Sequence, residues 1–348
     1  MDFYAGVDVS LKTMNICVVD GNGNVGGEAK LEIDPDAIEL SLAQWRIHLK
    51  RVGLEAFSSS VWLFGALADN GLPVICIETR HTKPALNAML NTTDRNEGKG
   101  IAQMRTGWFR AVHVKSEGAQ TLRALPVGRK TMRGKMLDVE QMIRGLLRPS
   151  GLKVGEISVG RFDARVRDLL AGKKELEAIV SPLLDASNAM RLQLAKLRRV
   201  VLTAERRDSA VRRMMTAPGV GALVALTFRA TVDNRARIKK STNVGAHFGL
   251  TPRRYQSGQA DRIGSIFKCS DELTRAMLHE AAIAILTRIP KNFKLRLWGL
   301  RLARKKGLKR AATAVARAPA VLLHKIWIDG TTFRFGAGSE RGRVAART

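Results

Sequence analysis

The chain contains few cysteines and few aromatic residues. Three of its 348 residues are cysteines, Cys17, Cys76 and Cys269, and 5% are aromatic. The cysteines are odd in number and far apart, so they fit neither a disulfide framework nor a zinc site, and we expect a reducing cytoplasmic setting. Apolar stretches such as Val220–Phe228 are too short to span a bilayer. The N-terminus has no basic segment followed by an apolar one, so we expect neither export nor membrane insertion.

Acidic residues are also scarce. The sequence holds 59 Lys and Arg against 31 Asp and Glu, a net charge of +28. Residues 1–98 carry 8 basic and 13 acidic side chains (−5), which leaves 51 basic and 18 acidic ones for the rest (+33). A field of that sign favours a polyanion, and nucleic acid is the usual one. The 45% hydrophobic content excludes a disordered chain. On charge alone, an architectural or ribosome-associated protein is the alternative to a nucleic-acid enzyme.

The N-terminal part predicts three consecutive strands followed by alternating helices and strands. A Gly21–Gly23 turn joins the second and third strands as a hairpin. Strands are expected at Phe3–Val9, Met14–Val19, Val25–Ile33, Arg51–Ala56 and Pro73–Glu78, and helices at Asp36–Lys50, Ser58–Asn70, Lys83–Leu90 and Asp94–Thr106. This order is typical of the ribonuclease H-like fold, a mixed sheet with helices on both faces.

The middle of the chain predicts long helices. Leu122–Leu147 is helical and basic, and Pro149–Gly151 marks a boundary. Asp163–Arg207 then shows heptad spacing, with apolar residues at eight of ten seam positions. We expect a coiled coil or a long helical hairpin, with a kink or a break at Pro182. The pattern is consistent with pairing between subunits, and also with two amphipathic helices that pack within one domain.

A strongly basic segment follows. No acidic residue lies between Glu280 and Asp329, and Arg288–Arg317 contains eleven Lys or Arg. Because no acids are interleaved, the pattern favours a phosphate-contacting surface over a solvated helix face. The residues that we expect to contact nucleic acid here are Arg301, Arg304, Lys305 and Lys306.

Four carboxylates are candidates for metal chemistry. Asp8 and Glu55 lie on otherwise apolar predicted strands, where an ionised side chain is costly unless it is paired or binds a metal. Asp94 and Glu97 are three residues apart at the start of a predicted helix, so they share one of its faces. N-terminal capping explains that second pair equally well. Carboxylates suit divalent metals, and metals assist phosphoryl transfer, so the four together predict a metal site.

The segment Gly249–Gly258 is a candidate for a second reactive site. It combines two arginines, Arg253 and Arg254, with the hydroxyl groups of Tyr255 and Ser257. Arginine binds phosphate through paired hydrogen bonds, and either hydroxyl can attack phosphorus. An ordinary turn is the alternative, since Ser-Gly is common in turns.

The Pro-Gly-x-Gly turn at Ala217–Gly221 is a further candidate. It precedes an apolar helical segment, Ala222–Phe228, whose first backbone N–H groups suit a phosphate. The turn is similar to the hairpin of helix-hairpin-helix DNA-binding motifs. A plain turn between two helices is the alternative.

The sequence resembles the transposases of the insertion-sequence 110 family over nearly the whole chain. The motifs that carry the resemblance are Gly6–Ser10, Gly53–Ala56, Thr93–Ala102, Val112–Val114, Ala217–Gly221, Phe248–Gly258 and Arg262–Gly264. The resemblance implies an α/β plus α architecture. Its parts would be a RuvC-like (ribonuclease H-like) catalytic domain at 1–150, a helical coiled-coil segment for oligomerisation at 151–208, a mainly helical transposase domain at 209–335 and a disordered basic tail at 336–348.

Members of this family are DEDD-type recombinases guided by a structured bridge RNA. Their four acidic positions fall on Asp8, Glu55, Asp94 and Glu97, which would hold Mg²⁺ or Mn²⁺. Their nucleophilic serine falls on Ser257, which would form a covalent phosphoserine–DNA intermediate at a site shared between subunits. Arg253 and Arg254 would neutralise the scissile phosphate. Glu97 departs from the family, in which the fourth acid is usually Asp.

The partners implied by the resemblance are donor and target DNA, the bridge RNA and further copies of the chain, as a dimer to tetramer. The expected location is the bacterial cytoplasm at the nucleoid. Two other functions stay open. A RuvC-like nuclease or Holliday-junction resolvase would use the acids alone, without serine chemistry, and an inactive relic would only bind nucleic acid. A covalent protein–DNA adduct would distinguish the recombinase from both.

Overall fold

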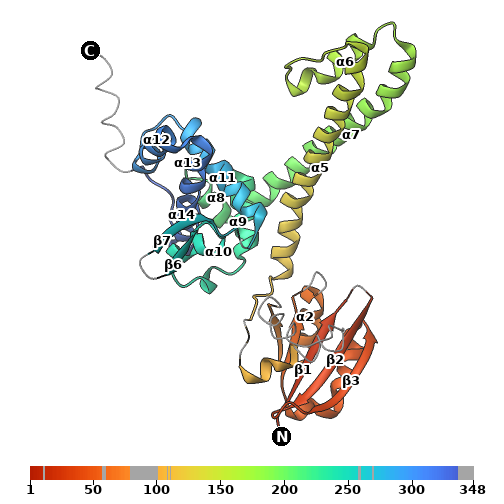
Figure 1. Cartoon of the computed structure of the whole chain (residues 1–348), viewed down its shortest axis with the longest axis vertical. Helices are drawn as coiled ribbons and strands as arrows, with labels where there is room; N and C mark the ends of the chain where they lie inside the picture. The colour runs from red at the N-terminus through yellow and green to blue at the C-terminus, as the bar shows by residue number, and fades with distance from the viewer. Residues whose placement is uncertain are drawn as a thin grey trace. The chain divides into compact units, whose positions relative to one another are not determined.

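The structure is a computed structural model of the chain, and it describes residues 1–10, 12–56, 60–78, 101–107, 109, 111–257, 260–268 and 270–335. The chain forms two compact units, Met1–Lys115 and Ser116–Thr348. Figure 1 shows the sheet of the first unit and the long helices and helical bundle of the second. No helix among the described residues is long and apolar enough to cross a membrane.

The first unit contains a five-stranded mixed sheet with the strand order β3-β2-β1-β4-β5. The strands are β1 (Phe3–Val9), β2 (Thr13–Asp20), β3 (Val25–Glu32), β4 (Leu49–Glu55) and β5 (Val74–Ile77). Strands β1, β2 and β3 form an antiparallel meander, whereas β4 runs parallel to β1 and β5 runs parallel to β4. The predicted mixed sheet is confirmed, and its strands begin and end within two residues of the predicted positions.

Both faces of this sheet are covered. Alternate residues of β1, among them Val7, pack with buried leucines of α1 (Pro35–Leu42) and α2 (Ser60–Asp69). A 3-10 helix, Ala43–His48, links α1 to β4. On the opposite face, Cys17 and Val19 pack with Ala102, and Ile77 packs with Ile101 and Met104. Residues 101–106 thus cover the second face of the sheet.

The predicted helices of this unit are described in part. The helix predicted over Asp36–Lys50 is shorter, because the chain tightens into the 3-10 helix after Leu42. Of the helix predicted over Asp94–Thr106, residues 101 and 102 are helical and Gln103–Thr106 form a 3-10 helix. The predicted helix Lys83–Leu90, and with it Asp94 and Glu97, lies outside the described residues.

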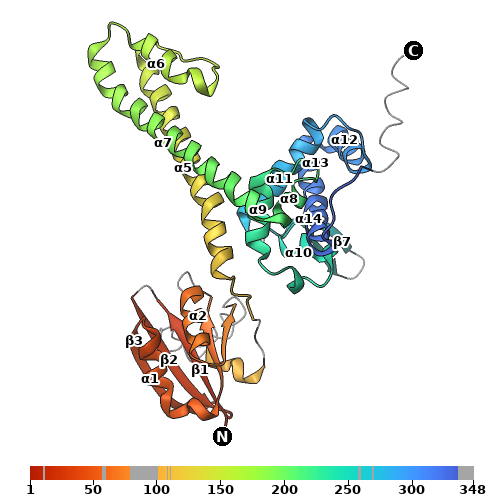
Figure 2. The same cartoon turned by 180° about the vertical axis from the view of Figure 1, so that it is seen from behind.

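The second unit begins with a long helical hairpin. Helix α5 (Glu117–Leu147) and helix α7 (Lys174–Arg207) run side by side, and α6 (Phe162–Leu170) lies near their connection (Figures 1 and 2). Short 3-10 helices at Arg148–Ser150 and Val159–Arg161 lie between α5 and α6. The heptad positions therefore pack at least partly within one chain, as a helical hairpin.

Helix α7 continues through Pro182, so the alternative of a break there is wrong. The break in the chain lies earlier, at residues 171–173 between α6 and α7. There Gly172 adopts a φ of 80°, a value that residues other than glycine rarely take. Proline removes one backbone donor from a helix, but tertiary packing outweighs that loss here. Val180 and Leu184 are fully buried on either side of Pro182.

A buried polar contact explains the serine among the apolar heptad positions. Ser187 of α7 donates a hydrogen bond to Glu140 of α5 (3.4 Å), and Arg191 forms an ion pair with the same carboxylate (2.9 Å). Ser187 and Glu140 are both buried. Such a contact satisfies polar groups only when the two helices lie in one register, so it favours that register over others.

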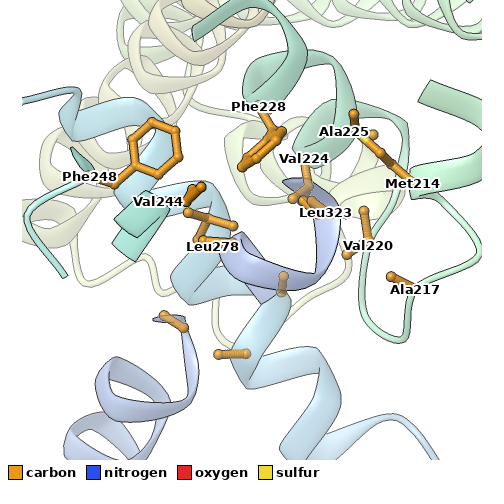
Figure 3. Packing of buried hydrophobic residues seen from close by; sticks show 14 of the residues in the cluster. Met214, Ala217, Val220, Val224, Ala225, Phe228, Val244, Phe248, Leu278 and Leu323 are labelled. Carbon is orange, nitrogen blue, oxygen red and sulfur yellow. The ribbon is translucent and has the colours of Figure 1, made fainter. Parts of the chain in front are cut away.

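The rest of the second unit is a helical bundle with one strand hairpin. Its elements are α8 (Ser209–Met214), α9 (Ala222–Val232), α10 (Val244–His247), β6 (Pro252–Ser257), β7 (Ala260–Ile266), α11 (Glu272–Thr287), α12 (Lys294–Lys306), α13 (Leu308–Val315) and α14 (Arg317–Asp329), with short 3-10 helices at Arg235–Arg237 and Ser241–Asn243. Figure 3 shows part of its core, where Phe228, Phe248, Leu278 and Leu323 come from four segments. The rings of Phe228 and Phe248 meet edge to face at 5.7 Å.

The units and the domains predicted from the sequence differ in where α5 belongs. Residues 1–150 are predicted as one domain, whereas the first compact unit ends at Lys115. Ser116 caps α5 and is hydrogen-bonded through its Oγ and its backbone N–H to the carboxylate of Asp233 (2.7 and 2.9 Å). This contact attaches the start of α5 to the helical bundle. The predicted tail, 336–348, lies outside the described residues.

Candidate functional site

Asp8 and Glu55 lie at the same edge of the sheet. Val7 of β1 pairs with Leu54 of β4, and the two strands are parallel, so Asp8 and Glu55 follow paired residues. Neighbouring strands are about 4.8 Å apart, and residues at matching positions project from the same face. The sheet thus brings together two of the four carboxylates predicted as metal ligands.

These two carboxylates face the side of the sheet covered by residues 101–106. Side chains alternate along a strand, and Val7 and Leu54 point into the core beside α1 and α2. Gly53, one step from Leu54, faces Ile101, Met104 and Ile77, since a Cβ there would come within 3.0 Å of all three. Asp8 and Glu55 share this second face by alternation.

The surroundings of the two carboxylates differ. Asp8 is 5% exposed, whereas Glu55 is half-buried at the end of β4. Burial raises the pKa of the nearby Cys76 thiol to about 11, and the charge of Glu55 acts in the same direction. At this pKa the Cys76 thiol is protonated at neutral pH.

The described residues supply only part of a metal site. Carboxylate oxygens are the ligands that Mg²⁺ and Mn²⁺ prefer, so Asp8 and Glu55 fit such an ion. Within the described ranges no group of three or more His, Cys, Asp or Glu side chains comes together. Asp94 and Glu97, the other two predicted ligands, lie outside those ranges, so the predicted set of four stays a prediction.

Ser257 lies at the end of an exposed strand hairpin. Strand β6 ends at Ser257, which pairs with Ala260 of β7, and residues 258 and 259 connect the two strands. All six residues of β6 are exposed. Leu250 and Ile266 contact the bundle core at the base of the hairpin, and five residue steps of about 3.3 Å separate Ser257 from Pro252. The hairpin thus carries the hydroxyl roughly 17 Å from its anchored base.

The two faces of the hairpin carry different arginines. Arg254 binds Asp261 through two hydrogen bonds (Nε to Oδ1 2.8 Å, NH2 to Oδ2 2.7 Å), and this raises the pKa of Arg254 and lowers that of Asp261. Asp261 pairs with Gln256, so this ion pair lies on the face opposite Ser257. Arg262 pairs with Tyr255 and shares the face of Ser257.

Arg262 is a functional candidate that the sequence analysis did not assign. The guanidinium of Arg253 lies 5.7 Å from the ring centroid of Phe267. Arg262 lies opposite Tyr255 and diagonal to Ser257 on the same face of the hairpin, and the period of two along a strand is the signal that could have identified it. The roles expected of Arg253 and Arg254 stay predictions.

The Ser257 hydroxyl forms no hydrogen bond with the described residues. Tyr255, on the same face, is 58% exposed. A serine hydroxyl needs a base or a metal to become a nucleophile. The hairpin therefore presents an exposed hydroxyl that forms no hydrogen bond to a described base.

Helix α12 presents the basic residues predicted to contact nucleic acid. Arg301, Arg304, Lys305 and Lys306 are all exposed, and none forms an ion pair with a described acidic residue. Gly299 lies on the packed side of the helix, where a Cβ would meet Leu286 at 2.6 Å. The four side chains are accessible, and their predicted contact with nucleic acid stays a prediction.

The Pro-Gly-x-Gly turn is packed into the bundle. Ala217 and Pro218 are buried, and a Cβ on Gly219 would lie 2.5 Å from the carbonyl oxygen of Ala281. Gly219 also adopts a φ of 76°. Close approach of the turn to helix α11 explains the need for glycine at position 219, which favours the plain turn over a phosphate site.

Comparisons with known proteins match the second unit most specifically. The family model described as "Transposase IS116/IS110/IS902 family" matches residues 211–297, which include the β6–β7 hairpin. A protein of Coxiella burnetii named "Transposase for insertion sequence element IS1111A" is 26% identical over 346 residues, 95% of this chain and 91% of that protein. A "Probable family 20 transposase" of Pseudomonas aeruginosa is 24% identical over 296 residues, 82% of this chain and 86% of that protein.

Among solved structures, the RuvC protein of T. thermophilus in complex with Holliday junction substrate is similar to part of the chain. The match covers 32% of this chain and 100% of that chain, with 14% sequence identity and a TM-score of 0.26.

Proposed function

From the premise that this chain is a transposase of the insertion-sequence 110 family, with a transposase domain at residues 211–297, we propose that it is a DNA recombinase that uses Ser257 as its nucleophile. It excises and inserts a mobile element by cutting and exchanging DNA strands. A structured bridge RNA that pairs with donor and target DNA guides it. RNA guidance would explain why the chain has a large excess of basic residues but no recognition helix that its sequence pattern identifies.

The observation that carries this proposal is the position of Ser257. It lies at the exposed end of a hairpin inside the matched transposase domain, on the same face as Arg262. Attack by its Oγ on the scissile phosphorus forms a phosphoserine ester while the bond to the departing DNA oxygen breaks. The proton that leaves the serine hydroxyl is balanced by the proton that the departing oxygen gains. Arg262, with Arg253, would bind the phosphate oxygens during this exchange.

The four acids would hold the divalent metal that the reaction needs. A metal ion held there would stabilise charge on the attacking and departing oxygens. Asp8 and Glu55 share a face of the sheet, and Ile101 packs against that face. Glu97 precedes Ile101 by four residues, a span of at most about 14 Å, so the chain allows Asp94 and Glu97 to reach the same edge. Glu97 would ligate with a side chain one methylene longer than the usual Asp.

The complete site would form between subunits. Ser257 and the acids belong to different compact units, and the serine hydroxyl forms no hydrogen bond with a described residue. The α5–α7 hairpin would associate with that of a second copy through its exposed apolar residues, which include Met142, Ile179 and Leu192. A dimer or tetramer would then place the serine of one subunit beside the carboxylates of another.

The test is to trap the covalent intermediate. The protein, its bridge RNA and Mg²⁺ are incubated with a nicked DNA substrate, the adduct is digested with protease, and mass spectrometry locates the modified residue. We expect phosphoserine at position 257, no adduct with Ser257→Ala, and an adduct with Tyr255→Phe. Both variants change exposed side chains, so each should keep the wild-type unfolding temperature and affinity for DNA. Cleavage without any adduct would instead favour a metal-dependent nuclease or resolvase, and an adduct on Tyr255 would overturn the serine assignment.

A further inference from the structure

An apolar hollow of about 700 Å³ opens beside the first turn of α12. Three phenylalanines line it, Phe293 before the helix and Phe333 and Phe335 after α14. Their ring centroids lie 5.0 to 6.4 Å apart, and each pair meets edge to face. All three side chains are half-buried, so their rings are partly accessible from the hollow.

The hollow is apolar inside and basic around its opening. Lys294 and Arg334 line it, both are exposed, and no acidic residue is among the described residues of its wall. The ammonium of Lys291 lies 4.9 Å from the ring centroid of Phe335. The lysine ammonium is attracted to the face of the aromatic ring. Together, the basic side chains around the opening attract an anionic ligand to the hollow.

The hollow continues along α12 into two shallower depressions. The first shares Lys294 and Leu297 with it, and the second shares Trp298, Arg301 and Arg304 with the first. Trp298 is 43% exposed among these arginines. Its spacing with Leu295 and Leu302 suggests that Trp298 packs on the core beside them. Gly299 faces the core instead, and Trp298 stays exposed. An aromatic surface and a row of positive charges therefore follow one helix.

We infer that this surface binds a single-stranded segment of nucleic acid, with one unpaired base in the phenylalanine hollow and a neighbouring base stacked on Trp298. The inference rests on the proposed function, since it specifies which form of nucleic acid the basic helix receives. Aromatic rings bind bases through their faces, whereas lysine and arginine bind the phosphates between them. A paired base is already stacked and hydrogen-bonded inside its duplex, so only an unpaired base can enter.

Other occupants match this chemistry less well. A neutral apolar ligand would gain nothing from the cations around the opening. The chain's own last residues, 336–348, contain one large apolar residue, Val344, and three arginines against one glutamate. That composition supplies neither an aromatic ring nor the negative charge that the surface would bind.

The test compares two oligonucleotides that share one backbone. A short thymidine strand and the same strand with abasic sugars are titrated into the full-length protein, and fluorescence anisotropy gives each affinity. We expect the wild-type protein to favour the strand that carries bases by about tenfold. Trp298→Leu and Phe335→Leu should each remove most of this preference, whereas Arg301→Gln should weaken binding of both strands equally.

The controls separate a role in binding from a role in folding. Trp62→Leu replaces an exposed tryptophan of the first unit and should leave the preference unchanged. Phe335 is half-buried, so Phe335→Leu could lower the unfolding temperature. Trp298 is exposed, so Trp298→Leu should leave the fold intact and then decides the test alone. Equal affinity of the wild-type protein for both strands, or a preference that survives Trp298→Leu, would overturn the inference and leave the recombinase proposal intact. A wild-type protein that binds neither strand nor duplex DNA would count against the proposed function itself.

Discussion

Asp8 and Glu55 occupy matching positions on neighbouring parallel strands, because Val7 of β1 pairs with Leu54 of β4. The chain reaches this arrangement across 46 intervening residues, which form the β2–β3 meander, α1 and a 3-10 helix. The sheet itself thus brings the two carboxylates together. Two like charges at neighbouring positions repel each other, so a cation bound between the carboxylates would stabilise the pair.

The first prediction concerns this pair. Asp8→Asn and Glu55→Gln keep the size of each side chain and remove its charge. Each variant should lower strand cleavage by a factor of about 100 or more, because the divalent metal loses an anionic ligand. Affinity for DNA and RNA, measured by filter binding, should change little.

Asp69→Asn is the matched control for both variants. It removes the charge of an exposed aspartate on α2 and should leave cleavage at the wild-type rate. Near wild-type cleavage by Asp8→Asn or Glu55→Gln would show that these carboxylates have a structural role only.

The second prediction separates packing within the α5–α7 hairpin from association between copies. Leu184 is fully buried, so Leu184→Ala should destabilise the protein by about 2–5 kcal/mol. Leu192 is 67% exposed on the same helix. Leu192→Glu should keep the unfolding temperature and reduce the mass measured by light scattering. An unchanged mass would remove this surface from the proposed interface.

The third prediction tests the close packing of α12. A Cβ at Gly299 would lie 2.6 Å from Leu286 Cδ2 and 2.8 Å from Val315 Cγ2. Gly299→Ala should therefore lower the free energy of unfolding by about 1–3 kcal/mol. Gly145→Ala on α5, where a Cβ meets nothing within 4 Å, should raise it by about 0.5–1 kcal/mol. Chemical denaturation measures both, and equal shifts of the same sign would contradict the packing described for Gly299.

The fourth prediction concerns pH. Burial of the ring inside the bundle lowers the pKa of His324 below its ordinary value of 6.5, and this outweighs the opposite effect of the hydrogen bond between Nε2 and the carbonyl oxygen of Arg235 (3.1 Å). The unfolded chain takes up a proton at this histidine before the folded chain does. Stability should therefore fall as the pH drops from 7 to 5.

Replacing His324 should reduce that dependence. Gln keeps one donor and one acceptor but does not titrate, so His324→Gln should flatten the unfolding temperature between pH 7 and pH 5. His48→Gln changes an exposed histidine of the first unit and should leave the wild-type slope. An equal slope in the wild-type protein and in His324→Gln would assign the pH effect to other groups.

Much of the first unit was predictable because its signals are local. The strands β1 to β5 follow apolar runs separated by turn residues, and the order of strands and helices fixes a mixed sheet. Asp8 and Glu55 stand out as single acids within such runs. Their proximity needs the register of β1 and β4, which no local pattern encodes.

The second unit was less predictable because its partners are distant in sequence. Heptad spacing identifies the apolar side of α7, but whether α5 or another copy covers it depends on tertiary packing. The continuation of α7 through Pro182 has the same origin. In the hairpin that carries Ser257, Arg262 and not Arg254 shares the face of the serine, and only the strand register reveals this.

The buried thiols have a practical consequence for chemical labelling. Cys17 and Cys76 are both buried, and the pKa of about 11 keeps Cys76 in its unreactive form at neutral pH. If Cys269 is replaced by serine, a cysteine introduced by Ser257→Cys becomes the accessible thiol of the whole chain. A maleimide fluorophore or a cross-linker attached there would then report from the end of the hairpin alone.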